Sequence, residues 1–332
     1  MGRAAETVVA FPLSIAMPVQ PVADAAPDPP GGPWSLPRSG RGGVAALLAE
    51  DCLCLAGPTA AGKSALAVAL AERIGAEIVS ADSMAIYTGL DIGTAKPSLE
   101  QRARVPHHLV DIVSPAAGAS VADWLSAAAA AFADIRRRGR RILVCGGTPL
   151  YLKALRDGLD ELPAADDATR ARLEDEADRL GLTVLHARLA AADPQAAGRV
   201  HPADRRRIVR ALEIVAAGGR AGTGWQRSGP SPWGDRLLVI DRPRRLLAER
   251  IERRVDAMFA AGLLDEVRGV VASGGIGPTA RQAAGYAECL AFLAGQGTLA
   301  EAVARTKQRT RQLAKRQLTW LRSFPEAIWI SA

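Results

Sequence analysis

This chain of 332 residues has few of the features from which zinc modules, disulfide frameworks and membrane spans are built. Its four cysteines are Cys52, Cys54, Cys145 and Cys289, and none belongs to a CxxC pair. We therefore expect free, buried thiols in a reducing compartment rather than a zinc site. No run of about 18 apolar residues occurs, so we expect no membrane span and a cytoplasmic protein.

Aromatic residues and lysine are also scarce. Aromatics make up only 4% of the chain, so its core must be built largely from Ala, Leu, Val and Ile. The 42 basic residues outnumber the 35 acidic ones and are nearly all arginine, which gives a net charge of +7. An arginine excess suits a polyanionic partner, but GC-rich coding raises the arginine and alanine content without any partner. The charge alone therefore does not decide whether the protein binds nucleic acid.

The composition and the hydrophobic pattern of the chain change near residue 51. Residues 1–45 hold 8 of the 21 prolines and show no hydrophobic period, which is typical of a disordered extension. After them, short apolar runs alternate with helical segments rich in Ala and Leu. The predicted strands are Cys52–Ala56, Glu77–Ser80, Leu109–Val113, Arg141–Cys145 and Arg236–Asp241, and the predicted helices between them include Ser64–Ile74 and Val121–Arg138.

This alternation predicts an α/β fold in which helices cover both faces of a parallel sheet. Residues 163–233 interrupt the pattern, because they are helical and highly charged to about Arg220 and then rich in Gly, Pro and Ser. We predict a helical insertion domain there, within a core made of residues 46–162 and 234–332. From Pro243 to Leu321 the pattern is again helical.

Residues 57–64 read GPTAAGKS and match the phosphate-binding loop GxxxxGK[ST]. A predicted strand precedes them and a predicted helix follows, which is the context that this loop requires. Its glycines let successive backbone N–H groups face a phosphate at a helix N-terminus, where Lys63 reaches the terminal phosphate and Ser64 holds Mg2+. We therefore predict a P-loop core whose diphosphate or triphosphate site consists of Gly57, Pro58, Thr59, Ala60, Ala61, Gly62, Lys63 and Ser64.

The loop alone does not identify the chemistry. A motor or switch ATPase is expected to carry a strand that ends in Asp between the loop and the rest of the sheet. The one apolar run that ends in Asp, Leu237–Asp241, comes late and is followed by Arg242 and Pro243. We interpret Asp241 as the end of a strand, and this disfavours hydrolysis as the main activity.

A polar motif that begins at Asp82 follows the predicted strand Glu77–Ser80, and the motif GGTPLY (146–151) follows another strand. Ligands bind outside the carboxyl ends of parallel strands, so we expect Asp82 to lie beside the phosphate loop. A carboxylate at this position can act as a general base or can cap a helix. The residues themselves leave both functions open.

Seven motifs together resemble the tRNA dimethylallyltransferase family, also called tRNA isopentenyltransferase, in its bacterial form. The resemblance implies transfer of a dimethylallyl group from dimethylallyl diphosphate to N6 of adenosine 37, beside the anticodon, in tRNAs that read codons beginning with U. It also implies a monomer whose P-loop binds a diphosphate donor rather than ATP. The motifs cover about residues 52–325 in order: GPTAAGKS (57–64), DSMAIYTGLDIGTAKP (82–97), GGTPLY (146–151), HPADRRRIVRALE (201–213), RIERRV (250–255), AGYAE (284–288) and KRQLTWLR (315–322).

The resemblance also implies residue roles. Asp82 becomes the base for the attacking amine, and the diphosphate clamp falls on Arg254, four residues after Arg250 on one helical face. These implied roles match the needs of the reaction. Displacement at an allylic carbon requires Mg2+ and cations that stabilise the departing diphosphate, together with a base that accepts a proton. The implied catalytic residues are Asp82, Lys63, Ser64, Arg254 and Thr148. The implied tRNA contacts are Asp82, Ser83, Met84, Ala85, Thr148, Arg170, Arg206, Arg207, Ile208, Val209, Arg210, Gln282, Gly285, Tyr286, Lys315, Arg316, Gln317, Trp320 and Arg322.

Two basic segments favour an RNA partner. Residues 305–322 carry seven basic residues and no acidic one, with Trp320 among them, whereas a solvated helix face normally mixes both signs. We predict phosphate contacts by this segment and by Asp204–Arg210, which has four arginines. The target adenine must leave its loop for an enzyme to reach N6, which suits a helical insertion that clasps the anticodon stem.

Three other functions were weighed against this one. An adenylate isopentenyltransferase acts on free adenine nucleotides and would not need the two basic segments. A P-loop kinase of the nucleoside or shikimate type could also use Asp82 as a base, but such kinases are usually shorter and lack the insertion. An RNA-binding protein without activity would not need the set Lys63, Ser64 and Asp82. Ala61, Ala85 and Ala283 depart from residues common in the family, but none of these changes removes a reacting group.

Overall fold

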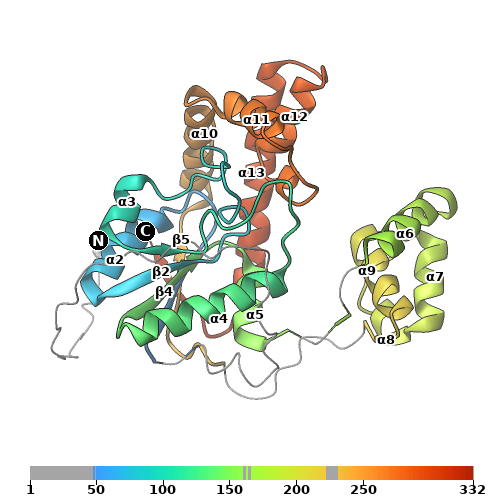
Figure 1. Ribbon diagram of the computed structural model, residues 1–332, viewed down its shortest axis with the longest axis horizontal. Helices are drawn as coiled ribbons and strands as arrows, with labels where there is room; N and C mark the ends of the chain where they lie inside the picture. Colours follow the sequence, from blue (N-terminus) through green and yellow to red (C-terminus); the bar gives the residue numbers. More distant parts are fainter. Residues whose placement is uncertain (1–47, 49, 160–161, 164–165, 222–230, 332) are drawn as a thin grey trace, which may run out of the picture. The chain divides into compact units, whose positions relative to one another are not determined.

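The computed structural model describes residues 48, 50–159, 162–163, 166–221 and 231–331 (Figure 1). The predicted extension, residues 1–45, and most of the Gly/Pro/Ser stretch lie outside the described residues. The elements are β1 (Cys52–Ala56), α2 (Lys63–Ile74), β2 (Ala76–Ser80), α3 (Leu99–Arg104), β3 (His107–His108), α4 (Val121–Arg137), β4 (Arg141–Gly146), α5 (Pro149–Asp157), α6 (Asp167–Leu180), α7 (Leu182–Ala192), α8 (Pro194–Ala197), α9 (Arg205–Ala216), β5 (Leu237–Asp241), α10 (Arg244–Ala260), α11 (Leu263–Ala272), η1 (Ala280–Gln282), α12 (Tyr286–Leu293), α13 (Leu299–Leu321) and β6 (Ile328–Ser331).

The described strands form one parallel sheet in the order β3-β2-β4-β1-β5-β6. Strand β1 lies between β4 and β5, and the loop that leaves its carboxyl end is the predicted phosphate loop. In such a sheet the carboxyl ends of all strands meet at one edge, where ligands bind. The predicted α/β class is confirmed. Because the strands are parallel, the phosphate loop lies at the edge of the sheet where their carboxyl ends meet.

Helices cover both faces of the sheet, as predicted. Successive strand residues alternate between two apolar clusters, so that Leu55 packs with Val68 of α2 while Cys54 packs in the same cluster as Phe132 of α4. Helix α2 therefore covers one face and α4 the other (Figure 1). Because the strands are buried on both sides, they read as continuous apolar runs rather than as alternating patterns.

One predicted strand is wrong and one strand was missed. Residues 109–113 do not form a strand, because Leu109 and Asp111 adopt positive φ angles of 61° and 58° that break the extended backbone. The segment instead follows the loop after β2, where the Ile112 N–H donates to the Ile86 carbonyl at 2.8 Å. The edge strand is the shorter β3, just before it. At the opposite edge, β6 follows the last helix and was not predicted.

The C-terminal helices pack directly against the phosphate loop. Apolar residues of α10 and α13 form a cluster, including Ile251 and Leu318, that also contains Ala60 of the loop. The loop is thus held between its own helix α2 and the pair α10 and α13. This packing brings residues about 190 positions apart in the sequence to the same site.

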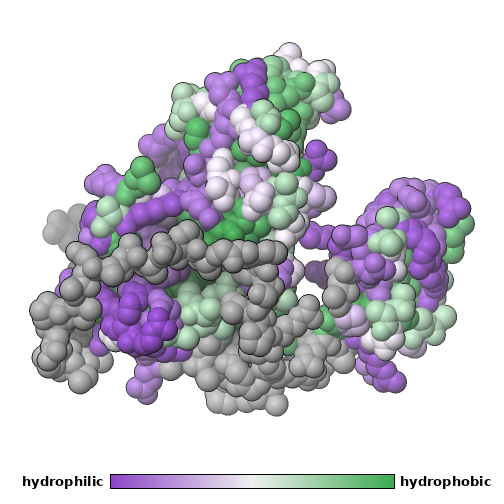
Figure 2. Space-filling view, in the orientation of Figure 1, coloured by the Kyte–Doolittle hydropathy of each residue, from purple (hydrophilic) through white to green (hydrophobic). Residues whose placement is uncertain are grey.

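Helices α6 to α9 form a cluster with an apolar core of its own, within the range predicted for the insertion. Leu173, Leu185, Leu189 and Ile208 are among its buried residues. Figure 2 shows mainly hydrophilic side chains over the surface of these helices. None of the helices in the described part of the chain combines the length and the hydropathy needed to cross a bilayer.

Candidate functional site

The phosphate loop curls between β1 and α2 in the way its sequence predicts. Gly62, the residue before α2, has a φ angle of 98°, in the left-handed region that glycine adopts without strain. A Cβ atom there would also lie 3.5 Å from the guanidinium groups of both Arg242 and Arg250. The Lys63 ammonium donates to the Pro58 carbonyl at 2.7 Å, across the mouth of the loop. The backbone N–H groups at the N-terminus of α2 can therefore bind an anion.

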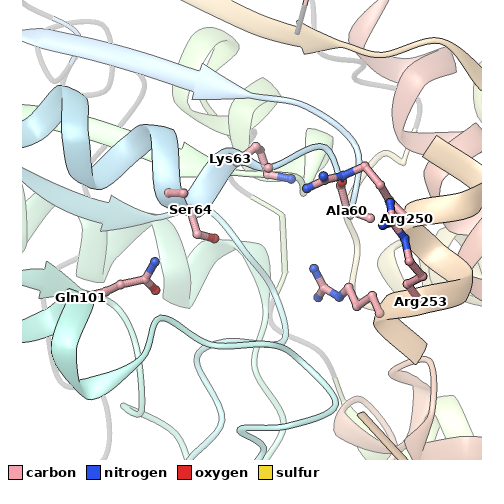
Figure 3. Close-up of a pocket in the computed structure, with 9 residues that line it drawn as sticks. Ala60, Lys63, Ser64, Gln101, Arg250 and Arg253 are labelled. Atoms are coloured by element: carbon pink, nitrogen blue, oxygen red, sulfur yellow. The ribbon is translucent and has the colours of Figure 1, made fainter. Parts of the chain in front are cut away.

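A cavity of about 550 Å³ lies in front of this loop. Lys63 and Ser64 border it from the loop and the start of α2, Arg250 and Arg253 border it from α10, and Gln101 borders it from α3 (Figure 3). Ala60, Gly62, Ala65 and Arg254 complete its lining. One lysine and three arginines thus surround a single cavity, and no acidic residue is part of this lining. Such a cavity suits a small ligand with several negative charges.

Two arginines bind the outer side of the loop. The Nε of Arg250 donates to the Ala60 carbonyl at 2.7 Å, and the Nε of Arg242 donates to the Ala61 carbonyl at 2.6 Å. These bonds fix α10 and the end of β5 against the loop while leaving guanidinium nitrogens for a ligand. Arg253 has no hydrogen-bond or ion-pair partner among the described residues.

Burial shifts the pKa values of the two innermost cations. Desolvation lowers the pKa of Lys63 to about 8, against a raising influence of the Cys145 thiol and the Asp82 carboxylate. Desolvation also lowers the pKa of Arg254, and Asp82 again acts in the opposite direction. The charge of Asp82 thus favours the protonated form of both cations. An arriving diphosphate would relieve the mutual repulsion of these cations.

Asp82 lies at the carboxyl end of β2, held there by a close approach of two backbones. A Cβ atom on Gly146 would lie 2.2 Å from the Ala81 carbonyl oxygen, so only glycine lets β4 end beside this segment. The Oδ1 atom of Asp82 accepts the Met84 N–H at 2.9 Å in a short turn. Asp82 is the N-cap of none of the described helices, and its Oδ2 atom accepts no hydrogen bond from the described residues. One carboxylate oxygen therefore holds the turn, and the other is left without a hydrogen-bond donor among the described residues.

Thr148 stabilises the same turn. Its Oγ1 atom accepts the Ser83 N–H at 3.0 Å and donates to the Ser83 hydroxyl at 3.3 Å. Thr148 is also the residue before α5, and its own N–H donates to the Ala81 carbonyl at 3.1 Å. The structure therefore brings Thr148 to the turn formed by Asp82 and Ser83.

Gln317 of α13 connects two loops of the site, and sequence reasoning had placed it on the tRNA surface. Its Oε1 accepts the Thr59 N–H at 2.8 Å, and its Nε2 donates to the Gly147 carbonyl at 2.6 Å. Only 9% of the residue is exposed. The side-chain amide of Gln317 therefore joins the phosphate loop to the loop after β4, and its contact with tRNA stays a prediction.

Several other residues that were predicted to contact tRNA have buried side chains, and their contact with tRNA stays a prediction. Ile208 and Val209 point into the core of the helical insertion. Tyr286 is fully buried, and its hydroxyl donates to the Glu266 carboxylate. Ala85 and Gly285 are buried as well. Their motifs are recognisable because they shape the backbone, not because they present side chains to a ligand.

The remaining predicted contacts fall into two groups. Arg170 and Arg210 both bind the buried carboxylate of Glu213, with nitrogen–oxygen distances of 2.9 and 3.0 Å. Met84 and Arg170 are partly buried. The residues that are exposed are Arg206, Arg207, Gln282, Lys315, Arg316, Trp320 and Arg322.

The basic residues of α13 differ in whether they form ion pairs. Lys307, Arg309 and Arg311 form ion pairs with acidic residues of α10 and α12, which are Glu252, Asp256 and Glu288. Lys315 and Arg316 form no ion pair with any described residue. These two line a shallow groove of about 380 Å³ together with Gln312, Thr319 and Trp320. Within this segment, Lys307, Arg309 and Arg311 are therefore paired with acidic residues, whereas Lys315 and Arg316 are cations without an ion-pair partner among the described residues.

Sequence reasoning missed two residues that line the cavity, Arg253 and Gln101, and also Arg242, which binds the phosphate loop. Arg253 could have been found, because it lies three residues after Arg250 and beside Arg254 on a helix. Arg242 was noted only as the residue after a strand. Gln101 belongs to a short surface helix, and no sequence signal links it to the loop.

Comparison with known proteins gives a consistent result. The family model described as IPP transferase matches residues 85–324, and the one described as isopentenyl transferase matches residues 51–107. The chain is 52% identical over 278 residues to a tRNA dimethylallyltransferase of Geobacter metallireducens, covering 82% of this chain and 90% of that one. It is 50% identical over 281 residues to a protein of the same name from an Anaeromyxobacter species, covering 84% and 94%.

Solved structures agree with the sequence matches. The tRNA isopentenylpyrophosphate transferase of Bacillus halodurans is 38% identical, with a TM-score of 0.61 over 84% of this chain and 89% of that one. A eukaryotic dimethylallyltransferase acting on tRNA is 28% identical, with a TM-score of 0.71 over 84% of this chain and 73% of that one.

Proposed function

The chain belongs to the tRNA dimethylallyltransferase (IPP transferase) family, and from this premise we propose the reaction that its site performs. It transfers a dimethylallyl group to tRNA, taking the group from dimethylallyl diphosphate and placing it on N6 of adenosine 37 in tRNAs that read codons beginning with U. The observation that carries the proposal is a phosphate loop in a strongly cationic cavity, with the carboxylate of Asp82 beside it.

The loop and α10 bind the diphosphate. Backbone N–H groups at the start of α2 and the ammonium of Lys63 contact the phosphate oxygens, and Arg254 faces them from α10. In the reaction, the N6 lone pair forms a bond with C1 of the dimethylallyl group. The C1–O bond breaks, and the diphosphate leaves with its electron pair. The surrounding cations stabilise the negative charge that grows on the leaving group.

Asp82 receives the proton that the amine loses. Its Oδ1 holds the turn to Met84, which orients the side chain and leaves Oδ2 for the amine. Thr148 fixes the neighbouring Ser83 and thereby the position of the turn. In this proposal the base belongs to the turn after β2, whereas the cations that hold the leaving group belong to α2 and α10.

Mg2+ fits this site as the cofactor. The described residues contain no cluster of three His, Cys, Asp or Glu side chains that would hold a metal by themselves. A P-loop does not need one, because Mg2+ there is bound by one hydroxyl together with phosphate oxygens and water. The exposed Ser64 borders the cavity at the start of α2 and supplies that hydroxyl. When bound, Mg2+ neutralises charge on the departing diphosphate.

We propose that the enzyme acts as a monomer, and in the cytoplasm, where tRNA and dimethylallyl diphosphate meet. A P-loop kinase, the alternative from another class of enzyme, would use ATP in the same cavity. The two differ in the substrate that is consumed.

Donor choice tests the proposal directly. We expect dimethylallyl diphosphate to be consumed only when tRNA is present, with release of diphosphate, because the attacking amine belongs to the RNA. ATP should not be hydrolysed at a comparable rate, since Asp241 ends β5 and is not among the residues that line the cavity. The measurement is diphosphate and phosphate release with each donor, with and without tRNA. Rapid ATP turnover that does not depend on tRNA would overturn the proposal.

The division of α13 predicts which cations bind tRNA. Changing both Lys315 and Arg316 to glutamine should make the dependence of log Kd on log salt concentration shallower by about 1 to 2, because fewer counterions are released. The matched double variant Arg309→Gln with Arg311→Gln should leave this slope nearly unchanged, because both side chains are paired with acidic residues of neighbouring helices. Binding of tRNA is titrated at several salt concentrations for each variant. Equal slopes for the two double variants would show that the groove beside Trp320 is not an RNA surface.

A further inference from the structure

Glu266 of α11 binds a loop that no part of the proposed mechanism has used. Its Oε2 accepts the N–H groups of Ile92 at 2.7 Å and Asp91 at 2.9 Å, and its Oε1 accepts that of Gly93 at 3.3 Å. The buried hydroxyl of Tyr286 donates to Oε1 as well. One carboxylate thus receives three successive backbone N–H groups and a phenol.

Successive N–H groups that converge in this way form an anion-binding nest, which here is filled by the protein's own carboxylate. Hydrogen bonds to an ionised carboxylate are about twice as strong as neutral ones, so this contact holds the loop firmly. The loop is also packed tightly: a Cβ atom on Gly93 would lie 2.4 Å from the Tyr286 ring and 2.8 Å from Leu263. Residues 91–93 therefore have one position against α11 and α12.

The loop held by Glu266 continues directly into a contact with Arg254. The Arg254 guanidinium donates to the Thr94 carbonyl at 3.3 Å, and the Thr94 hydroxyl donates to the Leu90 carbonyl at 2.5 Å. The same segment is tied back toward β2, because the Lys96 ammonium donates to the Tyr87 carbonyl at 2.5 Å. The turn that begins at Asp82 and the arginine on α10 are thus joined through residues 87–96.

We propose that Glu266 is a positioning residue for the transfer reaction: it sets the place of Arg254 on the diphosphate by holding residues 91–94 against α11. Glu266 touches neither substrate. It acts through the Thr94 carbonyl, which is the only described hydrogen-bond partner of the Arg254 side chain. The inference rests on the proposed function, in which Arg254 binds the leaving diphosphate.

The test compares Glu266→Gln with Asp265→Asn in the full-length protein. Both changes remove one negative charge from the same turn of α11, but Asp265 is exposed and pairs only with Arg268 on the surface. We expect Glu266→Gln to lower kcat about tenfold or more and to weaken binding of inorganic diphosphate by a similar factor. Asp265→Asn should change both by less than about twofold. Affinity for tRNA should stay the same in both variants.

A double-mutant cycle with Arg254→Gln separates positioning from general stability. If Glu266 acts through Arg254, adding Glu266→Gln to Arg254→Gln should cost less than about threefold further activity. The full tenfold loss in that background, or unchanged diphosphate binding in the single variant, would overturn the inference. Wild-type activity of Arg254→Gln itself would instead overturn the proposed clamp. If the glutamine variant does not fold, Glu266→Asp, which keeps the charge but is shorter by one methylene, provides the same comparison.

Discussion

Replacing Asp82 with asparagine is expected to lower kcat by about 100- to 10,000-fold, the range that positioned general bases contribute. The amine nitrogen must lose a proton as it attacks, and Asp82 is the carboxylate whose charge acts on both Lys63 and Arg254. Asparagine has the same size but no basic oxygen. The measurement is single-turnover transfer to tRNA at saturating donor, which isolates the chemical step from product release.

The same variant distinguishes a base from a structural carboxylate. Asparagine keeps an oxygen that can accept the Met84 N–H, so the turn after β2 should persist and the melting temperature should change little. Affinity for tRNA and for inorganic diphosphate should also be close to those of the unmodified protein. Near-normal turnover with an intact fold would mean that Asp82 only holds the turn and that another group accepts the proton.

Changing Arg254 to glutamine should lower kcat/KM by about 100- to 1,000-fold, as expected when one preformed contact to developing charge is removed. Arg254 borders the cavity, and burial lowers its pKa, so its charge is poorly solvated before a diphosphate arrives. A desolvated cation gains more from an anion than one that is hydrated. Most of the loss should fall on kcat, because the charge on the leaving oxygen is larger in the transition state than in the bound substrate.

Arg245→Gln is the matched control for this change. Arg245 lies on the same helix, but its side chain is 93% exposed and pairs with Glu249 four residues later. Removing it should alter kcat/KM by less than about twofold, because exposed ion pairs contribute little. Equal losses in the two variants would show that α10 acts through its overall charge and not through one placed arginine.

The parts of this protein that could be predicted from sequence are those that local rules determine. The strand before Gly57, the helix after it and the parallel sheet follow from apolar runs alternating with helical segments, and the structure has them within a residue or two. The phosphate loop could also be predicted from a local signal, since its glycines and Lys63 lie within eight consecutive residues. The place of Asp82 followed from one further rule, that ligands bind at the carboxyl ends of parallel strands.

The features that could not be predicted depend on contacts with residues that are distant in the sequence. Residues 109–113 look like a strand because they are apolar, but the loop after β2 imposes positive φ angles on two of them. The charge run on α13 gave no sign that Arg311 would pair with Glu252, because that acid lies on another helix. The same holds for Gln317, which reads as part of a basic RNA motif and instead connects two loops across more than 150 residues.

The most direct test of the central claim is a mass analysis of tRNA nucleosides. Purified protein is incubated with Mg2+, dimethylallyl diphosphate and unmodified tRNA, and the same reaction is run on a tRNA in which adenosine 37 is replaced by guanosine. After digestion, the first tRNA should contain an adenosine in which one hydrogen is replaced by a dimethylallyl group, and the second should contain none. Absence of this nucleoside from the first tRNA, or its presence in both, would contradict the proposed reaction.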